Sequence, residues 1–287
     1  GMIKNRYPLT RLSNNNYTPF FIMGSGRCGS TLLRKLLLAN PQVVIPPESG
    51  GLLAKSVRFF KENNYRSWEW LVDQIVEIWK RSSDFDYWGL QGKLASQDLH
   101  NLHQEHRSLE SIIGYIYMSY MRVYKPEAKM WGDKTPYATF GLPSICQLYP
   151  EGKIIHMLRD GRDVVNSLLK HRRCDSVEQA CARWNDSLKV LSMQHANMEV
   201  MTIRYEQLVT NPESVFNQIS QFLHTKLSYI ENAPPIHLGD GHLDHHSELQ
   251  RSLHQKGVGS WRREMRNDDI NRMLSLISLN LEKFEYV

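Results

Sequence analysis

Apolar residues are spaced in two ways along the chain, and the two spacings predict strands and helices in turn. Short apolar runs rich in β-branched and aromatic residues predict buried strands. Longer stretches whose apolar residues recur every three or four positions predict amphipathic helices. The predicted strands are 20–23, 43–45, 129–134, 153–158 and 200–203. The predicted helices that follow them are 32–37, 164–169, 176–195, 211–222 and 268–281.

This alternation is typical of an α/β protein with a mostly parallel sheet flanked by helices. The 287 residues, 41% of them hydrophobic, fit one domain with a sizeable core. Between 52 and 125 the pattern changes to helical patches, which we interpret as a helical insertion in a single domain spanning 1–287. Residues 18–51 then hold the first strand and its loop, and 126–287 the remainder of the sheet. Tryptophans of the insertion are expected in the core, with lining of a substrate site as the alternative: Trp68, Trp70, Trp79 and Trp88.

A glycine-studded turn separates the first predicted strand from the first predicted helix. Glycines 24, 26 and 29 let the backbone wrap around an anion, which the N-terminus of the helix also attracts. The spacing Gly24-x-x-x-x-Gly29-Ser30-Thr31 is nearly that of a P-loop, but Ser30 stands where the P-loop lysine would be. That lysine contacts the β- and γ-phosphates of a nucleoside triphosphate, so its absence argues against ordinary ATP or GTP hydrolysis. Arg27 places a cation earlier in the loop.

The segment Arg27-Cys28-Gly29-Ser30-Thr31 resembles the 5′-phosphosulfate loop of sulfotransferases that use 3′-phosphoadenosine 5′-phosphosulfate (PAPS). The resemblance implies a P-loop-like fold, PAPS as the donor and 3′,5′-adenosine bisphosphate (PAP) as the product. It implies donor contacts from Gly26, Arg27, Cys28, Gly29, Ser30 and Thr31. A structural turn or another nucleotide loop is the alternative interpretation of this stretch.

A second segment, 158–167, resembles the 3′-phosphate site of the same family, which implies that Arg159 and Ser167 bind that phosphate. An arginine fork suits a phosphate because it donates two parallel hydrogen bonds. The alternative is that Arg159 and Arg162 pair with Asp160 and Asp163 as structural ion pairs at the helix start, a role that we expect for Arg162 and Asp163 but not for Arg159.

Two later segments extend the resemblance. Tyr205, in Arg204-Tyr205-Glu206, matches a tyrosine that lies near the adenine. The stretch 255–263 is similar to the late glycine loop that closes over the 3′-phosphate, and implies contacts from Gly259, Trp261 and Arg262. It departs from the pattern of the cytosolic enzymes, because Arg262 replaces a lysine and one glycine is displaced.

The catalytic groups are expected at the carboxyl ends of the strands, where open α/β sheets bind their ligands. Glu48 and Lys134 both follow predicted strands and match catalytic residues of the tyrosylprotein sulfotransferase branch. The resemblance implies that Glu48 is the base, and that Lys134 assists the leaving phosphate together with Arg27. Glu48 could instead complement the dipole of the next helix, and Lys134 could be a surface lysine. Thr135 and Pro136 are expected to begin a helix beside Lys134.

The sequence therefore predicts a PAPS-dependent sulfotransferase that transfers a sulfuryl group to a hydroxyl acceptor. The alternatives are a P-loop kinase and a non-catalytic nucleotide-binding module. A nucleic-acid-binding protein ranks last, because 35 basic against 30 acidic residues leave a net charge of only +5. Residues 52–125, the expected acceptor region, carry no motif that identifies the acceptor.

No metal is expected, since PAPS chemistry needs none. Histidines 237, 242, 245 and 246 lie in a segment expected to be a polar, mobile loop, and His156 is expected to be a hydrogen-bonded core residue. The four cysteines form no Cys-x-x-Cys pair, and no membrane span or signal peptide is evident. These features predict reduced thiols and a cytoplasmic protein.

Overall fold

A parallel five-stranded sheet forms the centre of the computed structural model, which describes residues 6–10, 19–193, 198–231 and 255–287. The strands are β1 (Phe20–Met23), β2 (Val43–Val44), β3 (Met130–Lys134), β4 (Lys153–Leu158) and β5 (Glu199–Arg204). Their order is β2-β3-β1-β4-β5, and each neighbouring pair is parallel. The expected α/β class is therefore confirmed.

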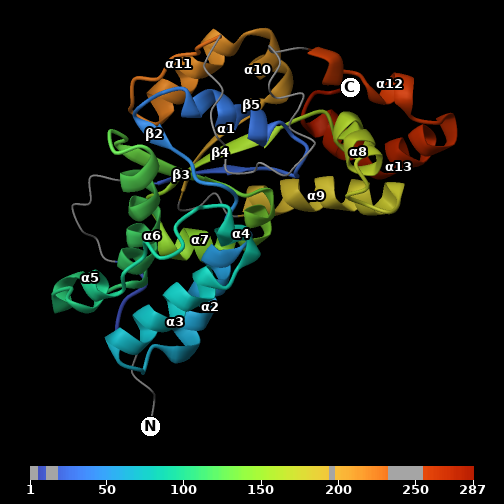
Figure 1. Cartoon of the computed structure of the whole chain (residues 1–287). Coiled ribbons are helices and arrows are strands. Elements are labelled where there is room, and N and C mark those ends of the chain that lie inside the picture. Colours follow the sequence, from blue (N-terminus) through green and yellow to red (C-terminus); the bar gives the residue numbers. More distant parts are fainter. Residues whose placement is uncertain (1–5, 11–18, 194–197, 232–254) are drawn as a thin grey trace.

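Helices cover both faces of the sheet. Successive residues of a strand point to opposite faces, so neighbouring residues of β1 pack into two different clusters. Phe20 and Ile22 pack into a cluster with α1 (Ser30–Leu38), α10 (Tyr205–Thr210) and α11 (Pro212–Phe222). Phe21 and Met23 pack into a second cluster with helices of the other face: α2 (Leu52–Asn63), α6 (Leu109–Tyr124) and α7 (Leu142–Leu148). Figure 1 shows α10 and α11 above the sheet, and α2 and α7 below it.

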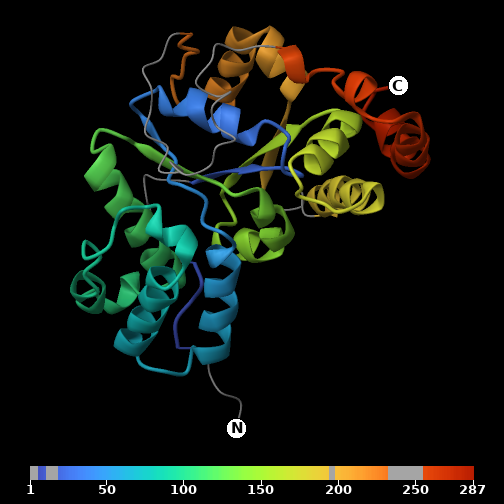
Figure 2. The same cartoon turned by 45° about the vertical axis from the view of Figure 1, so that its right-hand side comes forward.

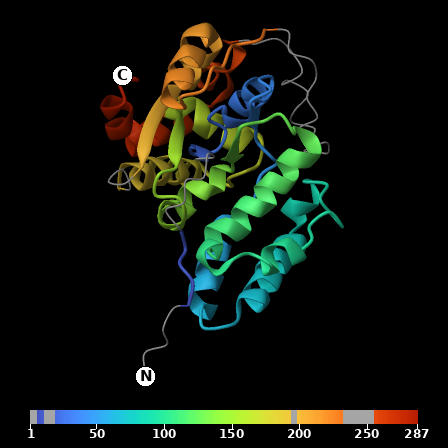
Figure 3. The same cartoon turned by 90° about the vertical axis from the view of Figure 1, so that its left-hand side faces the viewer.

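The insertion at 52–125 forms a helical layer that extends away from the sheet (Figure 3). Between α2 and α6 it contains α3 (Trp68–Lys80), α4 (Ser83–Asp86), α5 (Gln97–His100) and η1 (Gln104–His106). Trp68, Trp79 and Trp88 are fully buried there, which confirms core packing for these three, whereas Trp70 is half-buried. The ring of Tyr117 stacks on that of Trp131 of β3, with the centroids 4.0 Å apart, and so joins the insertion to the sheet.

A separate cluster of helices packs beyond β4 (Figure 2). It contains α8 (Gly161–Lys170), α9 (Val177–Met193), α12 (Trp261–Glu264), which follows η4 (Gln255–Gly257), and α13 (Asn267–Lys283). Gly161 allows the close approach of α8 and α9, since a Cβ there would lie 2.8 Å from the Trp184 ring. In the part of the chain that the structure describes, no helix is long and apolar enough to cross a membrane.

The helix expected after Lys134 is present as a 3₁₀-helix, η2 (Pro136–Gly141), with Thr135 at its N-cap position and Pro136 in its first turn. The Thr135 side chain, however, does not cap it. The Thr135 hydroxyl instead accepts a hydrogen bond from the Ser49 N–H at 2.9 Å. This long-range partner competes successfully with local capping, and it links the segment after β2 to the end of β3. His156 behaves as expected, because it is buried and lies 3.3 Å from the Thr202 hydroxyl.

Candidate active site

The turn between β1 and α1 begins at Gly24, and the Thr139 side chain of η2 holds the backbone there. The Gly24 N–H donates to the Thr139 hydroxyl at 3.1 Å, and that hydroxyl donates to the Gly24 carbonyl at 3.0 Å. A Cβ on Gly24 would lie 2.6 Å from the Cys28 sulfur, so only glycine fits. Cys28 is buried, and burial raises the pKa of its thiol, which makes it a packing residue and not a nucleophile.

The turn also has the backbone shape of an anion site. Gly26, Arg27 and Gly29 have φ angles of 78°, 54° and 95°, and left-handed residues of this kind are typical of backbone turns that bind anions. Gly29 is the N-cap of α1 and supplies no side-chain acceptor to the first N–H groups of that helix. These N–H groups and the helix dipole favour a bound anion.

Arg159, at the end of β4, joins this turn to the late glycine loop. Its guanidinium donates to the Arg27 carbonyl at 2.8 Å and to the Gly257 carbonyl at 2.7 Å. The Arg159 Nε is buried and has no hydrogen-bond partner among the described residues. Nearby, the Arg27 Nε donates to the Ser167 hydroxyl at 3.0 Å. Arg27, Arg159 and Ser167 thus form one cationic group whose unsatisfied donor suits a phosphate.

Tyr205 closes one side of this group. Its ring lies under the Arg159 guanidinium, 4.4 Å from ring centroid to carbon. A Cβ on Gly29 would lie 2.4 Å from the same ring. Tyr205 is therefore wedged between the anion turn and Arg159, although its expected contact with adenine stays a prediction.

The late glycine loop, 255–263, is held in place by Asp163, for which the sequence predicted an ion pair. The fully buried Asp163 accepts hydrogen bonds from the Gly259 N–H at 2.8 Å, the Ser260 hydroxyl at 2.9 Å and the Trp261 N–H at 3.1 Å. Arg162 pairs instead with Asp160, at 2.7 Å. The structural ion pair expected for Arg162 at the helix start is therefore present, with Asp160 as its partner, whereas Asp163, expected in the same role, accepts hydrogen bonds from the late loop.

Arg162 and Arg262 lie against the Trp261 ring, with their guanidinium carbons 4.8 and 4.7 Å from its centroid. Gly259 has a φ of 69°, which favours glycine there. The donor-binding roles expected for Gly259, Trp261 and Arg262 thus concern a loop that Asp163 anchors to α8.

Glu48 and Lys134 meet at the other end of the turn. Lys134 is 1% exposed, and its ammonium donates to the Glu48 carboxylate and, at 3.3 Å, to the Thr31 hydroxyl. The Glu48 side chain is 42% exposed, so its carboxylate also faces solvent. A carboxylate and an ammonium thus lie next to the first turn of α1, and these are the kinds of group that proton removal and charge stabilisation at a bound anion would use.

Two further carboxyl groups near Glu48 carried no recognisable sequence signal. Asp133 is buried and accepts a 2.6 Å hydrogen bond from the Tyr117 hydroxyl, and burial raises the pKa of Asp133. Asp84, on α4, lies so close to Gly50 that a Cβ on that glycine would be 1.8 Å from its carboxylate. Burial and the charge of Glu48 raise the pKa of Asp84. The insertion thereby brings an acidic side chain close to Glu48.

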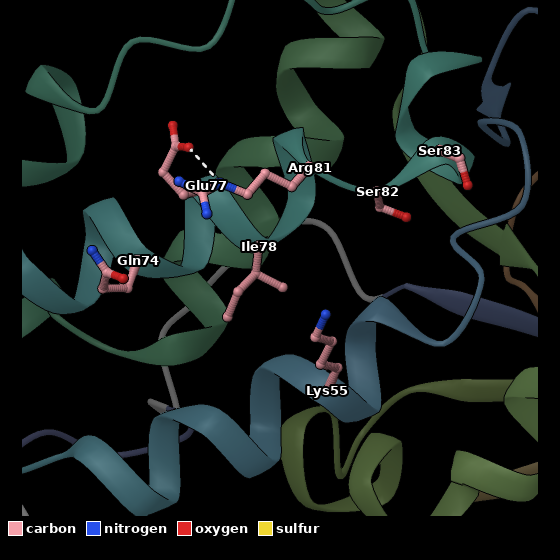
Figure 4. Close-up of a pocket in the computed structure, with 7 residues that line it drawn as sticks. All are labelled: Lys55, Gln74, Glu77, Ile78, Arg81, Ser82 and Ser83. Carbon is pink, nitrogen blue, oxygen red and sulfur yellow. Dashed lines mark hydrogen bonds and ion pairs between the residues drawn. The ribbon is translucent and has the colours of Figure 1, made fainter.

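A cavity of 440 Å³ lies next to α4, between α2 and α3. Figure 4 shows Lys55 of α2 pointing toward Ile78 of α3, with Arg81, Ser82 and Ser83 along the rim. The cavity is lined entirely by the insertion, the region expected to hold the acceptor.

In the described ranges, no three metal-ligating side chains gather into a site. Histidines 237, 242, 245 and 246 lie outside the described residues.

The structure brings together three features at the carboxyl edge of a parallel sheet: the glycine turn at the start of α1, the group of Arg27, Arg159 and Ser167, and the Glu48–Lys134 pair. The chain belongs to the sulfotransferase family, whose model matches residues 19–229. It is 25% identical to protein-tyrosine sulfotransferase A of Caenorhabditis elegans over 222 residues, which are 73% of this chain and 50% of that protein. The chain spans about half the length of the curated relatives it matches first.

Two solved structures share the fold. The sulfotransferase domain of the Synechococcus olefin synthase superposes with a TM-score of 0.63 at 21% identity, covering 95% of this chain and 98% of that one. Mouse sulfotransferase SULT7A1, crystallised with PAP, gives a TM-score of 0.52 at 11% identity, covering 98% and 88%. At these identities the likeness concerns the fold.

Proposed function

We propose that the protein is a PAPS-dependent sulfotransferase that transfers a sulfuryl group to a hydroxyl acceptor. The observation that carries this proposal is the buried Lys134, which reaches both the Glu48 carboxylate and the Thr31 hydroxyl of the anion turn. A base and a cation on one side of the turn provide for chemistry at the donor's 5′ end. The arginine group on the other side provides for a second phosphate.

In the proposed reaction the acceptor oxygen attacks sulfur in line with the bridging oxygen of the donor. A new O–S bond forms, the bridging S–O bond breaks, and its electron pair leaves with the 5′-phosphate of PAP. The Glu48 carboxylate takes the hydroxyl proton. Lys134 and Arg27 offset the negative charge that develops on the bridging and sulfuryl oxygens. Substrate binding would move Lys134 from Glu48 to the donor and release the base.

Donor selectivity follows from Arg159, Ser167 and the late loop. The unsatisfied Nε of Arg159 is suited to the 3′-phosphate, which ATP lacks. The turn N–H groups would bind the 5′-phosphate, with Gly26, Cys28, Gly29, Ser30 and Thr31 supplying the backbone. Tyr205 would stack near the adenine, and Gly259, Trp261 and Arg262 would close over the nucleotide.

The acceptor site is assigned to the insertion. The half-exposed Glu48 lies just before the insertion in the chain, and the cavity within the insertion has the size of small-ligand sites. The relatives named as protein-tyrosine sulfotransferases favour a hydroxyl acceptor. The cytoplasmic location stays a prediction: all four cysteines are free thiols, which suits a reducing compartment.

Calorimetry with PAP and with magnesium ATP, on wild type and Arg159→Ala, tests the donor assignment. Tight binding of PAP alone, lost in the variant, supports it. A preference for ATP would favour the P-loop kinase instead. Transfer of labelled sulfate from PAPS to a panel of hydroxyl acceptors then tests catalysis. Binding of PAP without turnover on any acceptor would leave the non-catalytic nucleotide-binding module.

A further inference from the structure

A cation that the sequence motifs do not include lies against the anion turn. The Arg183 Nε, from α9, donates to the Ser25 carbonyl at 2.9 Å. A Cβ on Gly26 would lie 2.7 Å from the Arg183 Nη2, and Gly26 has a φ of 78°. The absence of a side chain at Gly26 therefore lets the half-buried guanidinium rest on the backbone of the turn.

The position of Arg183 is fixed by its helix. The neighbouring Trp184 is buried against Gly161 at the start of α8. On its other side, α9 packs against η2, the segment that follows Lys134. Because Thr139 of η2 holds Gly24, α9 and η2 approach the same end of the turn.

Arg27 and Arg159 each make a contact toward the side assigned to the 3′-phosphate. The Arg27 Nε bonds Ser167, and Arg159 bridges to the late loop at Gly257. Arg159 is therefore assigned to the 3′-phosphate, whereas Arg27, whose Nε is held by Ser167, keeps the catalytic role proposed above. At residues 25–26 a further cation, Arg183, lies beside the backbone.

We propose that Arg183 binds the sulfuryl oxygens of the donor, an inference that rests on the proposed function. An arginine carries five N–H donors in a planar fork, so one guanidinium can hold the Ser25 carbonyl and a sulfuryl oxygen together. Arg183 and Lys134 then flank the transferring group. The glycine at 26 keeps the path between Arg183 and that group open.

The experiment compares PAP, which lacks the sulfuryl group, with PAPS in the absence of acceptor. Calorimetry on Arg183→Ala is expected to show an about tenfold larger loss of affinity for PAPS than for PAP, as for a lost hydrogen bond between charged groups. Equal losses for the two ligands, or none, would mean that Arg183 only braces the turn, and the proposal would be wrong. Retained PAP binding shows that the variant folds.

Arg183→Gln serves as a second variant, since its amide can still donate to Ser25 but carries no charge. This variant is expected to lose affinity for PAPS relative to PAP, as Arg183→Ala does. If its PAPS affinity relative to PAP equals that of the wild type, the proposal is overturned. Lys189→Ala removes an exposed cation from the same helix and is expected to change neither affinity. Arg159→Ala is expected to weaken both ligands equally. If the wild type binds neither ligand, the proposed function fails. If the ratio of PAPS affinity to PAP affinity is the same in Arg183→Ala as in wild type, only the inference on Arg183 is overturned.

Discussion

Glu48 and Lys134 form an ion pair across 86 residues of sequence, and the parallel pairing of β2 with β3 brings them together. The pair is asymmetric, because the lysine is buried and the carboxylate is partly exposed. A buried ammonium needs a partner. The Glu48 carboxylate supplies it while one side stays open to the solvent from which an acceptor would arrive.

Glu48→Gln is expected to lower kcat about 10²–10⁴-fold, because the amide can accept the bond from Lys134 but cannot take the acceptor proton. PAP affinity should stay within about twofold of wild type, since donor contacts are assigned to other residues. Steady-state sulfate transfer and calorimetry measure the two effects. Glu62→Gln, the same change on the exposed face of α2, is the control. Turnover retained in Glu48→Gln would remove Glu48 from the role of base.

Gly29→Ala should destabilise the fold more than Gly51→Ala does. Each glycine is the N-cap of an α-helix and has a left-handed backbone conformation, with φ angles of 95° and 91°. An alanine at either position therefore costs about 1–2 kcal/mol of backbone strain. At Gly29 the new Cβ also meets the Tyr205 ring, whereas nothing lies within 4 Å of a Cβ at Gly51. Urea unfolding should show an extra loss of about 1–3 kcal/mol for Gly29→Ala. Tyr205→Ala should remove that excess, and equal losses in both variants would argue against the contact.

Local sequence was sufficient for the strands, the anion turn and the buried tryptophans. The run 20–23 is apolar throughout, and two of the glycines that follow it, Gly26 and Gly29, have positive φ angles. The positions of Arg159 and Lys134 at the carboxyl edge of the sheet were also predictable, because Arg159 directly follows an apolar strand and Lys134 ends one. In these cases the signal lies within a few residues of the feature it predicts.

The remaining site residues depend on partners far away in the chain. Asp163 serves donors 96 to 98 positions later, and Arg183 reaches a carbonyl 158 positions earlier. Thr135 bonds Ser49 in preference to capping its own helix. Such contacts exist only once the sheet order and the packing of α8 and α9 are known, and no local pattern encodes them.

Asp163→Ala should weaken both the fold and the donor site. It leaves the N–H groups of Gly259 and Trp261 without their acceptor, which should cost about 2–4 kcal/mol in free energy of unfolding. PAP affinity should fall as the late loop loses its anchor. Urea unfolding and calorimetry measure both effects, with Asp186→Ala, an exposed position on α9, as the control. Unchanged PAP affinity in a folded Asp163→Ala variant would separate this loop from the donor.

The buried carboxyl of Asp133 should make stability depend on pH. Burial raises its pKa, so the folded protein binds a proton more tightly than the unfolded chain does, and this contribution to stability is lost as the pH rises through the folded-state pKa. Asp133→Asn can still accept the bond from Tyr117 and carries no such charge. Its free energy of unfolding should therefore rise relative to wild type by roughly 1.4 kcal/mol per pH unit, starting near pH 4 and levelling above the raised pKa.

Urea unfolding of wild type and Asp133→Asn from about pH 4 to 8 measures this difference. Tyr117→Phe removes a hydrogen bond that lowers the pKa of Asp133, so in that background the rise should extend to higher pH. A difference between wild type and Asp133→Asn that stays constant with pH would show that the carboxyl titrates alike in the folded and unfolded chain. In that case burial beside Lys134 and Glu48 would not hold its proton, and the negative charge at this edge would be larger than the geometry indicates.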